Sequence, residues 1–173
     1  MNVVLDLGAN IECDEKNLFD FACMGSALYR SLFENNLPKV ALLNVGLEEN
    51  KGSDILKKTF TSLKKNKKGN FDFCGYIEGN HIMDGNVDVI VTDGFTGNIA
   101  LKTAEGTANF ITENLRKSLN KLSVLLSYNS LKKLKNKLDP RKYNGAIFLG
   151  LEKPVVKSHG GTDSIGFAHS INV

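Results

Sequence analysis

The sequence predicts an α/β protein with a parallel sheet, and three observations lead to this prediction. Residues 40–45 and 87–91 form nearly continuous apolar runs, which is the pattern of strands buried on both faces. Segments with apolar residues at helical spacing separate such runs along the chain. The hydrophobic content of 42% and the charged content of 24% are those of an ordinary globular protein. We therefore expect a single α/β domain over residues 1–173.

The stretch of residues 87–102 joins a predicted central strand to a turn with two glycines and the start of a helix. Ligands of open α/β sheets bind at the carboxyl ends of the strands, where such turns lie. Gly94 and Gly97 have no Cβ, so the backbone can bend sharply there and approach a ligand closely. The free N–H groups of the helix start, with Lys102 further along, would bind an anion. The alternative is an ordinary turn followed by a solvated lysine, because the GxGxxG pattern is absent.

The chain before this stretch predicts two strand–helix units and a third strand. Residues 3–7 resemble a short buried strand, and because a buried strand rarely begins a chain, we expect a segment before it. Asp14 is a candidate N-cap for a helix that runs to about residue 34. Ser53 is a candidate cap for a second helix, and residues 71–77 alternate like a strand before a loop at residues 78–81. The loop at residues 46–53 lacks the order of a P-loop, which excludes a nucleoside triphosphate site there.

A long helix is predicted after the central turn, followed by an amphipathic segment that is strongly basic. Residues 116–142 hold nine basic residues and one acid, so they carry +8 in a chain whose net charge is +3. The segment is either a solvated helical face or a surface for an anionic membrane or an acidic partner. The residues expected to make such contacts are Leu122, Leu125, Leu126, Lys132, Lys133 and Lys135. Nucleic acid is not expected, because Tyr128 is the one aromatic residue in this segment.

The end of the chain predicts two short strands, at residues 146–149 and 155–157, and a last short helix. Ser158, His159, Gly160 and Asp163 lie between the second strand and the helix. This places a hydroxyl, an imidazole and a carboxylate close together at the carboxyl end of a strand. The segment is either part of a functional site or a simple capping turn.

Cysteine and histidine usage gives little support to a metal or cofactor site. Cys13, Cys23 and Cys74 form no CxxC pair, so we expect reduced thiols that lie mostly in the core. The histidines show no ligand spacing, and no cofactor is predicted. No apolar run reaches the roughly 18 residues needed to cross a bilayer, and no signal-peptide pattern follows Met1.

Several sequence blocks resemble, in order, the bacterial phosphate acyltransferase family of phospholipid synthesis. The blocks are residues 5–10, 21–26, 43–46 with 51–52, 93–98 with 101–103 and 105–106, 149–151, 154–157, 159–160 and Asp163. The family's chains are about twice as long, so this chain resembles a C-terminal portion without the Asp-Ala-Met-Gly-Gly-Asp loop. A local difference is Asn80-His81, where the family usually has Arg-Asp after Glu-Gly.

The resemblance implies a three-layer α/β/α fold of the isocitrate/isopropylmalate dehydrogenase and phosphotransacetylase type, with a protruding amphipathic helical pair. It also implies a cytoplasmic homodimer that associates peripherally with membranes. The implied reaction is attack of inorganic phosphate on the thioester of fatty acyl carrier protein, which gives acyl phosphate and the free carrier.

The reaction requires a bound phosphate and donors for an oxyanion, but no protein nucleophile. We expect Lys102 and the backbone of residues 94–98 to hold the phosphate or the oxyanion. Asn10 and Asn98 would orient substrate through their amides, and His159 would transfer a proton. Asp93 or Asp163 would orient the histidine or the lysine, and Gly94, Gly97 and Gly160 belong to the same predicted site.

One other function is compatible with parts of the sequence, and a second lacks the patterns that it would need. A catalytically incomplete fragment could dock acyl carrier protein or membrane through residues 116–142. A β-decarboxylating dehydrogenase would need metal-binding aspartates and a nicotinamide site, and neither pattern is found.

Overall fold

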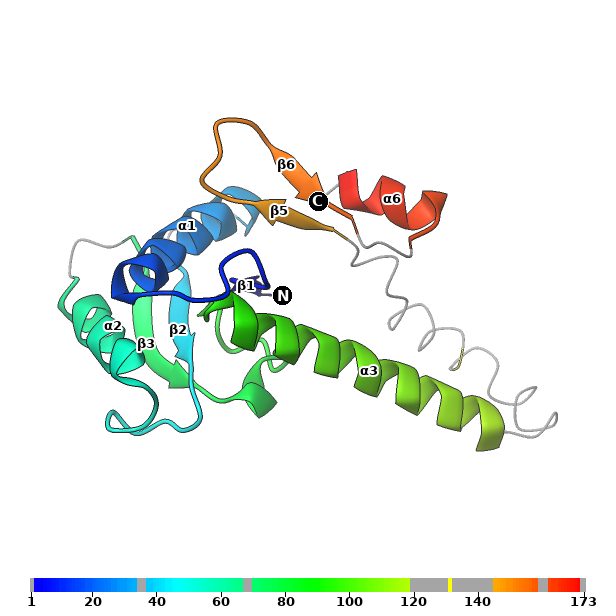
Figure 1. The fold of residues 1–173 in the computed structure, drawn as a ribbon, viewed down its shortest axis with the longest axis horizontal. Coiled ribbons are helices and arrows are strands. Elements are labelled where there is room, and N and C mark those ends of the chain that lie inside the picture. The colour runs from blue at the N-terminus through cyan, green and yellow to red at the C-terminus, as the bar shows by residue number, and fades with distance from the viewer. Residues whose placement is uncertain are drawn as a thin grey trace. The chain divides into compact units, whose positions relative to one another are not determined.

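The computed structural model describes residues 2–33, 37–66, 70–118, 131, 145–158 and 162–171 (Figure 1). The chain divides into two compact units, Met1–Lys102 and Thr103–Val173. The predicted organisation as one domain stays a prediction.

The first unit is built on a four-stranded parallel sheet with the strand order β1-β4-β2-β3. Its strands are β1 (Val3–Leu5), β2 (Lys39–Leu43), β3 (Asp72–Ile77) and β4 (Val89–Val91). Helix α1 (Glu15–Phe33) connects β1 to β2, α2 (Asp54–Lys65) connects β2 to β3, and the short helix η1 (Gly79–His81) follows β3. Helix α3 (Gly94–Ser118) begins directly after β4. The predicted α/β class and parallel sheet are confirmed.

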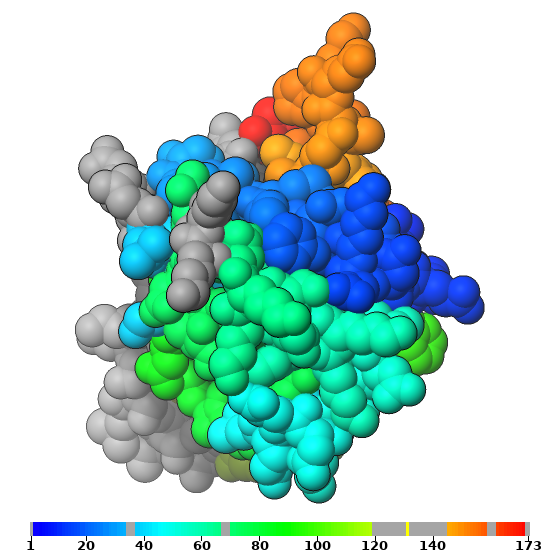
Figure 2. All heavy atoms as spheres, turned by 90° about the vertical axis from the view of Figure 1, so that its left-hand side faces the viewer, coloured from blue at the N-terminus to red at the C-terminus, as the bar shows by residue number. Residues whose placement is uncertain are grey.

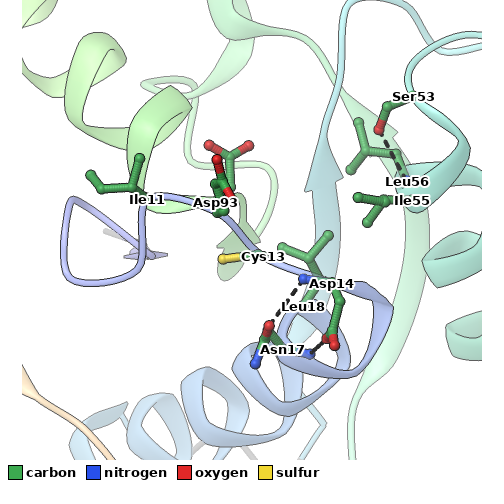
Figure 3. A pocket seen from close by; sticks show the side chains of 10 residues that line it. Ile11, Cys13, Asp14, Asn17, Leu18, Ser53, Ile55, Leu56 and Asp93 are labelled. Atoms are coloured by element: carbon green, nitrogen blue, oxygen red, sulfur yellow. Dashed lines mark hydrogen bonds between the residues drawn. The ribbon is translucent and has the colours of Figure 1, made fainter.

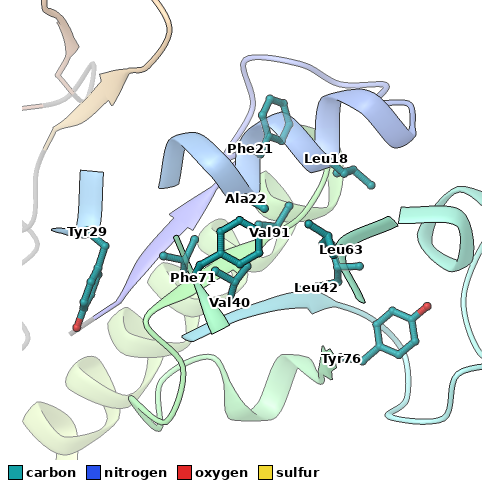
Figure 4. Close-up of a cluster of buried hydrophobic side chains, with 11 residues drawn as sticks. Leu18, Phe21, Ala22, Tyr29, Val40, Leu42, Leu63, Phe71, Tyr76 and Val91 are labelled. Atoms are coloured by element: carbon teal, nitrogen blue, oxygen red, sulfur yellow. The ribbon is translucent and has the colours of Figure 1, made fainter. Parts of the chain in front are cut away.

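Two clusters of apolar side chains lie on opposite faces of this sheet, because side chains alternate along each strand. Val40 and Leu42 of β2 pack in the larger cluster with side chains of α1 and α2 (Figure 4). Ala41 and Leu43 of the same strand belong to the smaller cluster. Strand β4 is buried on both faces in the same way, which explains the continuous apolar runs of the two central strands.

Helices α1 and α2 pack beside each other, as the space-filling view shows with α1 in blue above α2 in turquoise (Figure 2). The Asp14 carboxylate accepts the Asn17 N–H at 2.8 Å, and the Ser53 hydroxyl accepts the Leu56 N–H at 3.3 Å. Both predicted N-caps are therefore confirmed. The apolar stripe of α1 is buried as far as Tyr29, whereas Leu32 is 51% exposed near the end of the helix.

The second unit contains the rest of α3, an antiparallel hairpin and a short helix. Strands β5 (Ala146–Phe148) and β6 (Val155–Lys157) pair in the hairpin, and α6 (Ser164–Ile171) contacts β6. The two strands and the last helix were predicted from the sequence and are confirmed. Along α3 beyond Lys102, Phe110 is 69% and Ile111 is 47% exposed.

The prediction that the cysteines lie mostly in the core is wrong. All three are free thiols, Cys13 is half-buried, and Cys23 and Cys74 are exposed. Cys23 follows the buried Ala22 on the outward side of α1, and Cys74 occupies an outward position of the edge strand β3. None of the helices in the described part of the chain is long and apolar enough to cross a membrane.

Candidate functional site

The carboxyl edge of the sheet is organised by Asp6, which follows β1. Its carboxylate accepts the N–H groups of Gly8 and Ala9 at 2.9 Å each, and that of Asn10 at 2.6 Å. The Asn10 side-chain amide donates a fourth hydrogen bond at 2.8 Å. Burial by itself would raise the pKa of Asp6, but these hydrogen bonds outweigh it and lower the pKa. Asp6 therefore stays ionised and folds residues 6–10 around itself.

Hydrogen bonds join this loop to the neighbouring strand β4 and to the start of α3. Asp6 and Thr92 extend the pairing of the strands, since Asp6 N–H donates to Thr92 O at 2.9 Å. Gly94 N–H donates to Asn10 O at 2.8 Å, and the Asn98 amide donates to Leu7 O at 3.0 Å. Asn10, Gly94 and Asn98, which the sequence predicted for one site, are thus brought together.

The two glycines allow a close contact within the chain that was not predicted from the sequence. The helix already begins at Gly94, so both glycines lie in its first turn and not in a preceding turn. A Cβ on Gly97 would overlap the carbonyl oxygen of Asp6, and a Cβ on Gly94 would crowd Asn10 O. The missing side chains therefore allow α3 to approach the loop of its own chain.

The N-terminus of α3 is already capped by the protein. The Asp93 carboxylate accepts the Thr96 N–H at 2.7 Å and the Thr96 hydroxyl at 2.8 Å. Gly97 N–H donates to Asp93 O, and Gly94 N–H donates to Asn10 O. Among the described residues, this leaves Phe95 N–H as the backbone donor of the first turn without a partner in the chain.

The other predicted site residues lie further along α3, in the second unit or outside the described part of the chain. Lys102 is exposed on α3, four residues after Asn98 and so on the same side of the helix. Asp163 belongs to the second unit, where its carboxylate accepts the Gly166 N–H at 2.9 Å at the start of α6. His159, Gly160, Leu122, Leu125, Leu126, Lys132, Lys133 and Lys135 lie outside the described residues. Their predicted roles stay predictions.

Two features of the site were missed in the sequence. The Asp6 carboxylate holds the loop of residues 6–10 together, although no role was predicted for it from the sequence. Its place between an apolar run and Gly8 is the signal of an Asx-type turn. The other feature is a hollow of about 600 Å³ beside Asp93 (Figure 3). One of its walls comes from Ile11 and Cys13 after β1, and the facing wall comes from Ile55 and Leu56 of α2.

The described residues hold no group of three or more histidine, cysteine or acidic side chains that could bind a metal ion. What the site offers is one lysine and a backbone N–H at the carboxyl edge of a parallel sheet, beside two side-chain amides that already donate hydrogen bonds to the loop after β1. Such a set can orient and polarise an anionic or carbonyl-containing ligand.

Fold and site together define a parallel α/β protein whose loops at the carboxyl ends of the strands lie where open α/β sheets commonly bind ligands. The chain belongs to the fatty acid synthesis protein family, whose sequence profile matches residues 1–173. It is 60% identical over 178 residues to the phosphate acyltransferase of Pelagibacter ubique, covering 100% of this chain and 54% of the relative. It is 51% identical over 177 residues to that of Rhodospirillum centenum, covering 99% and 50%. The family predicted from the motifs is confirmed.

The chain spans about half the length of the curated relatives it matches. Among solved structures, EutD phosphotransacetylase from Staphylococcus aureus is similar, with 20% identity and a TM-score of 0.47. That likeness covers 61% of this chain and 38% of the other.

Proposed function

We propose that this chain carries the residues that transfer a fatty acyl group from acyl carrier protein to inorganic phosphate. The observation that supports this most strongly is the 60% identity over the whole chain with a relative named phosphate acyltransferase. The site at the carboxyl edge of the sheet supports it as well, because its donors suit a phosphate and a thioester carbonyl.

The proposed reaction balances without a cofactor. An oxygen of hydrogen phosphate attacks the thioester carbonyl carbon, and a C–O bond forms while the C–S bond breaks. The proton of the phosphate passes to the leaving sulfur, so the products are acyl phosphate and the thiol of the carrier. The protein has to bind both reactants, orient them and stabilise the negative charge that develops on the carbonyl oxygen.

Lys102 is proposed to supply positive charge for the phosphate, and the Phe95 N–H is proposed as a donor to the oxyanion. The Asn98 amide and the Asn10 carbonyl hold the loop after β1 against α3, so in this proposal the two residues position the donors. Asp93 is proposed to fix the start of α3 by capping it. His159, Gly160 and Asp163 are retained as the proposed proton-transfer and phosphate-binding segment.

Replacing Lys102 by alanine is expected to reduce the rate of acyl phosphate formation by more than about tenfold, because it removes a charge that binds phosphate. The measurement uses the Pelagibacter ubique relative with its matched segment replaced by these 173 residues. Lys65→Ala is the control, since Lys65 is exposed at the end of α2 and outside the proposed site. A Lys102→Ala graft that turns over like the Lys65→Ala graft would remove Lys102 from the proposal.

A second candidate function is docking of acyl carrier protein or an anionic membrane through residues 116–142, which carry +8. It is favoured by this local concentration of positive charge, which suits an acidic protein or an anionic lipid surface. Palmitoyl carrier protein and vesicles with anionic lipid, each offered to the 173-residue chain, test it directly. Salt-sensitive binding without acyl phosphate formation would favour docking over catalysis.

The finer structural expectations are part of the same proposal. We propose the three-layer α/β/α arrangement of the phosphotransacetylase type, a protruding amphipathic helical pair, a homodimer and peripheral association with the membrane from the cytoplasm. The resemblance of the sequence blocks to the family supports these expectations, and the exposed apolar residues of α3 are compatible with a partner surface.

A further inference from the structure

The hollow beside Asp93 differs chemically from a phosphate site. Glu12, Asp14 and Asp93 are among the ten described residues that line it, and none of the ten is basic. Three carboxylates in a lining that contains no basic side chain repel an anion. Phosphate therefore has to bind elsewhere, and the hollow suits an uncharged ligand.

Four of the polar side chains that line the hollow, those of Asp14, Asn17, Ser53 and Asp93, already make hydrogen bonds within the chain. Asp14 and Asn17 bond to each other through their side chains and N–H groups, at 2.8 and 3.0 Å (Figure 3). The Ser53 hydroxyl accepts Leu56 N–H, and both oxygens of Asp93 accept donors of Thr96. A ligand in the hollow would gain little from these groups, because their hydrogen bonds are made.

The apolar side chains of the hollow, in contrast, are open to a ligand. Ile11 is 55% and Ile55 is 42% exposed, and they lie on facing walls. Leu18, Leu56 and the half-buried Cys13 complete the apolar lining. Burial raises the pKa of the Cys13 thiol, so this side chain is also uncharged at neutral pH. Covering these surfaces with an apolar chain is favourable, and a volume of about 600 Å³ is ample for one.

We propose that this hollow binds the alkyl chain of the acyl thioester, an inference that rests on the proposed function. Asp93 lines the hollow and also caps α3, the helix that bears Asn98 and Lys102. An alkyl chain seated between Ile11 and Ile55 would thus end beside the helix proposed to bind phosphate. The hollow sets the preference for acyl-chain length.

The test measures binding of S-alkyl pantetheine thioethers with six, eight and ten carbons to the 173-residue chain by calorimetry. These probes are uncharged and cannot react. Affinity is expected to rise about fourfold for each added methylene that is buried, with a negative heat-capacity change. Ile55→Asp is expected to weaken binding at least about tenfold and to remove the length dependence, since it places a charge on the apolar wall.

Ile55→Asp should fold normally, because an acid in the first turn of α2 interacts favourably with the helix dipole. Val45→Asp is the matched control, since Val45 is 80% exposed and does not line the hollow. Ile11→Ser, in an exposed loop position, should also weaken binding. Equal affinities of wild type, Ile55→Asp and Val45→Asp, or no binding of any probe, would overturn the inference.

Failure of this inference can be distinguished from failure of the proposed function. Acyl phosphate formation by the grafted relative, with the same chain-length preference in Ile55→Asp as in wild type, would overturn the inference and leave the function standing. Length-dependent probe binding without acyl phosphate formation would overturn the function and support an alkyl-binding hollow.

Discussion

Replacing Gly97 by alanine is expected to lower the free energy of unfolding by about 3 kcal/mol, because the added methyl group has no room. A Cβ at this position would overlap the Asp6 carbonyl oxygen and lie 2.9 Å from Thr92 Cγ2. This carbonyl belongs to the backbone of Asp6. The side-chain carboxylate of Asp6 also holds residues 8–10 in place. The helix can make room only by moving away, which would also break the bond from Asn98 to Leu7 O. Denaturant unfolding monitored by circular dichroism measures the effect.

Gly106→Ala in the same helix is the matched control. A Cβ on Gly106 would meet nothing within 4 Å, so the substitution is expected to stabilise by about 0.5–1 kcal/mol through helix propensity. The two substitutions are chemically identical, and they should change the free energy of unfolding in opposite directions. Stabilisation by Gly97→Ala would contradict the close approach of α3 to the loop.

Replacing Asp6 by alanine is expected to cost about 3 kcal/mol of stability at neutral pH, since it removes an ionised acceptor of four hydrogen bonds. The side chain is buried, with Asp6 8% exposed, so water cannot fully replace the carboxylate. Asp20→Ala, at an exposed position of α1, is the control and should change stability by less than about 0.5 kcal/mol. Equal stabilities of the two variants would contradict the role of Asp6.

The Asp6 contribution should depend on pH in a defined direction. Its pKa is lowered from 3.8 in the folded state, so its stabilisation is fully present above about pH 3.8 and is lost as the pH falls through the lower folded value. The stability difference between wild type and Asp6→Ala should therefore shrink below pH 4. A difference that grows on acidification would mean that the folded pKa is raised.

The elements could be predicted from the sequence because strong local patterns specified them. The central strands are apolar without interruption, and Asp14 and Ser53 mark helix starts by capping. The cysteines could not be placed in this way, because burial depends on which side of α1 or β3 faces the core. The residue type alone does not reveal that side.

The sequence predicted which residues lie at this edge of the sheet better than it predicted their contacts with one another. Asn10, Gly94, Gly97 and Asn98 do meet at one edge, as motifs at the carboxyl ends of parallel strands indicate. Their mutual contacts were not foreseen, because a glycine that admits a ligand and one that admits a neighbouring carbonyl look the same in a sequence. The hollow between α2 and the β1–α1 loop is formed by residues about forty positions apart, and no local pattern marks it.

The most direct test of the proposed function is the formation of acyl phosphate, trapped as a hydroxamate, by the Pelagibacter ubique relative carrying this chain at its matched segment. With palmitoyl carrier protein, the proposal predicts product only when phosphate is present, at a rate within about tenfold of the unmodified relative. A folded graft that binds the acyl carrier protein but forms no acyl phosphate would contradict the proposal.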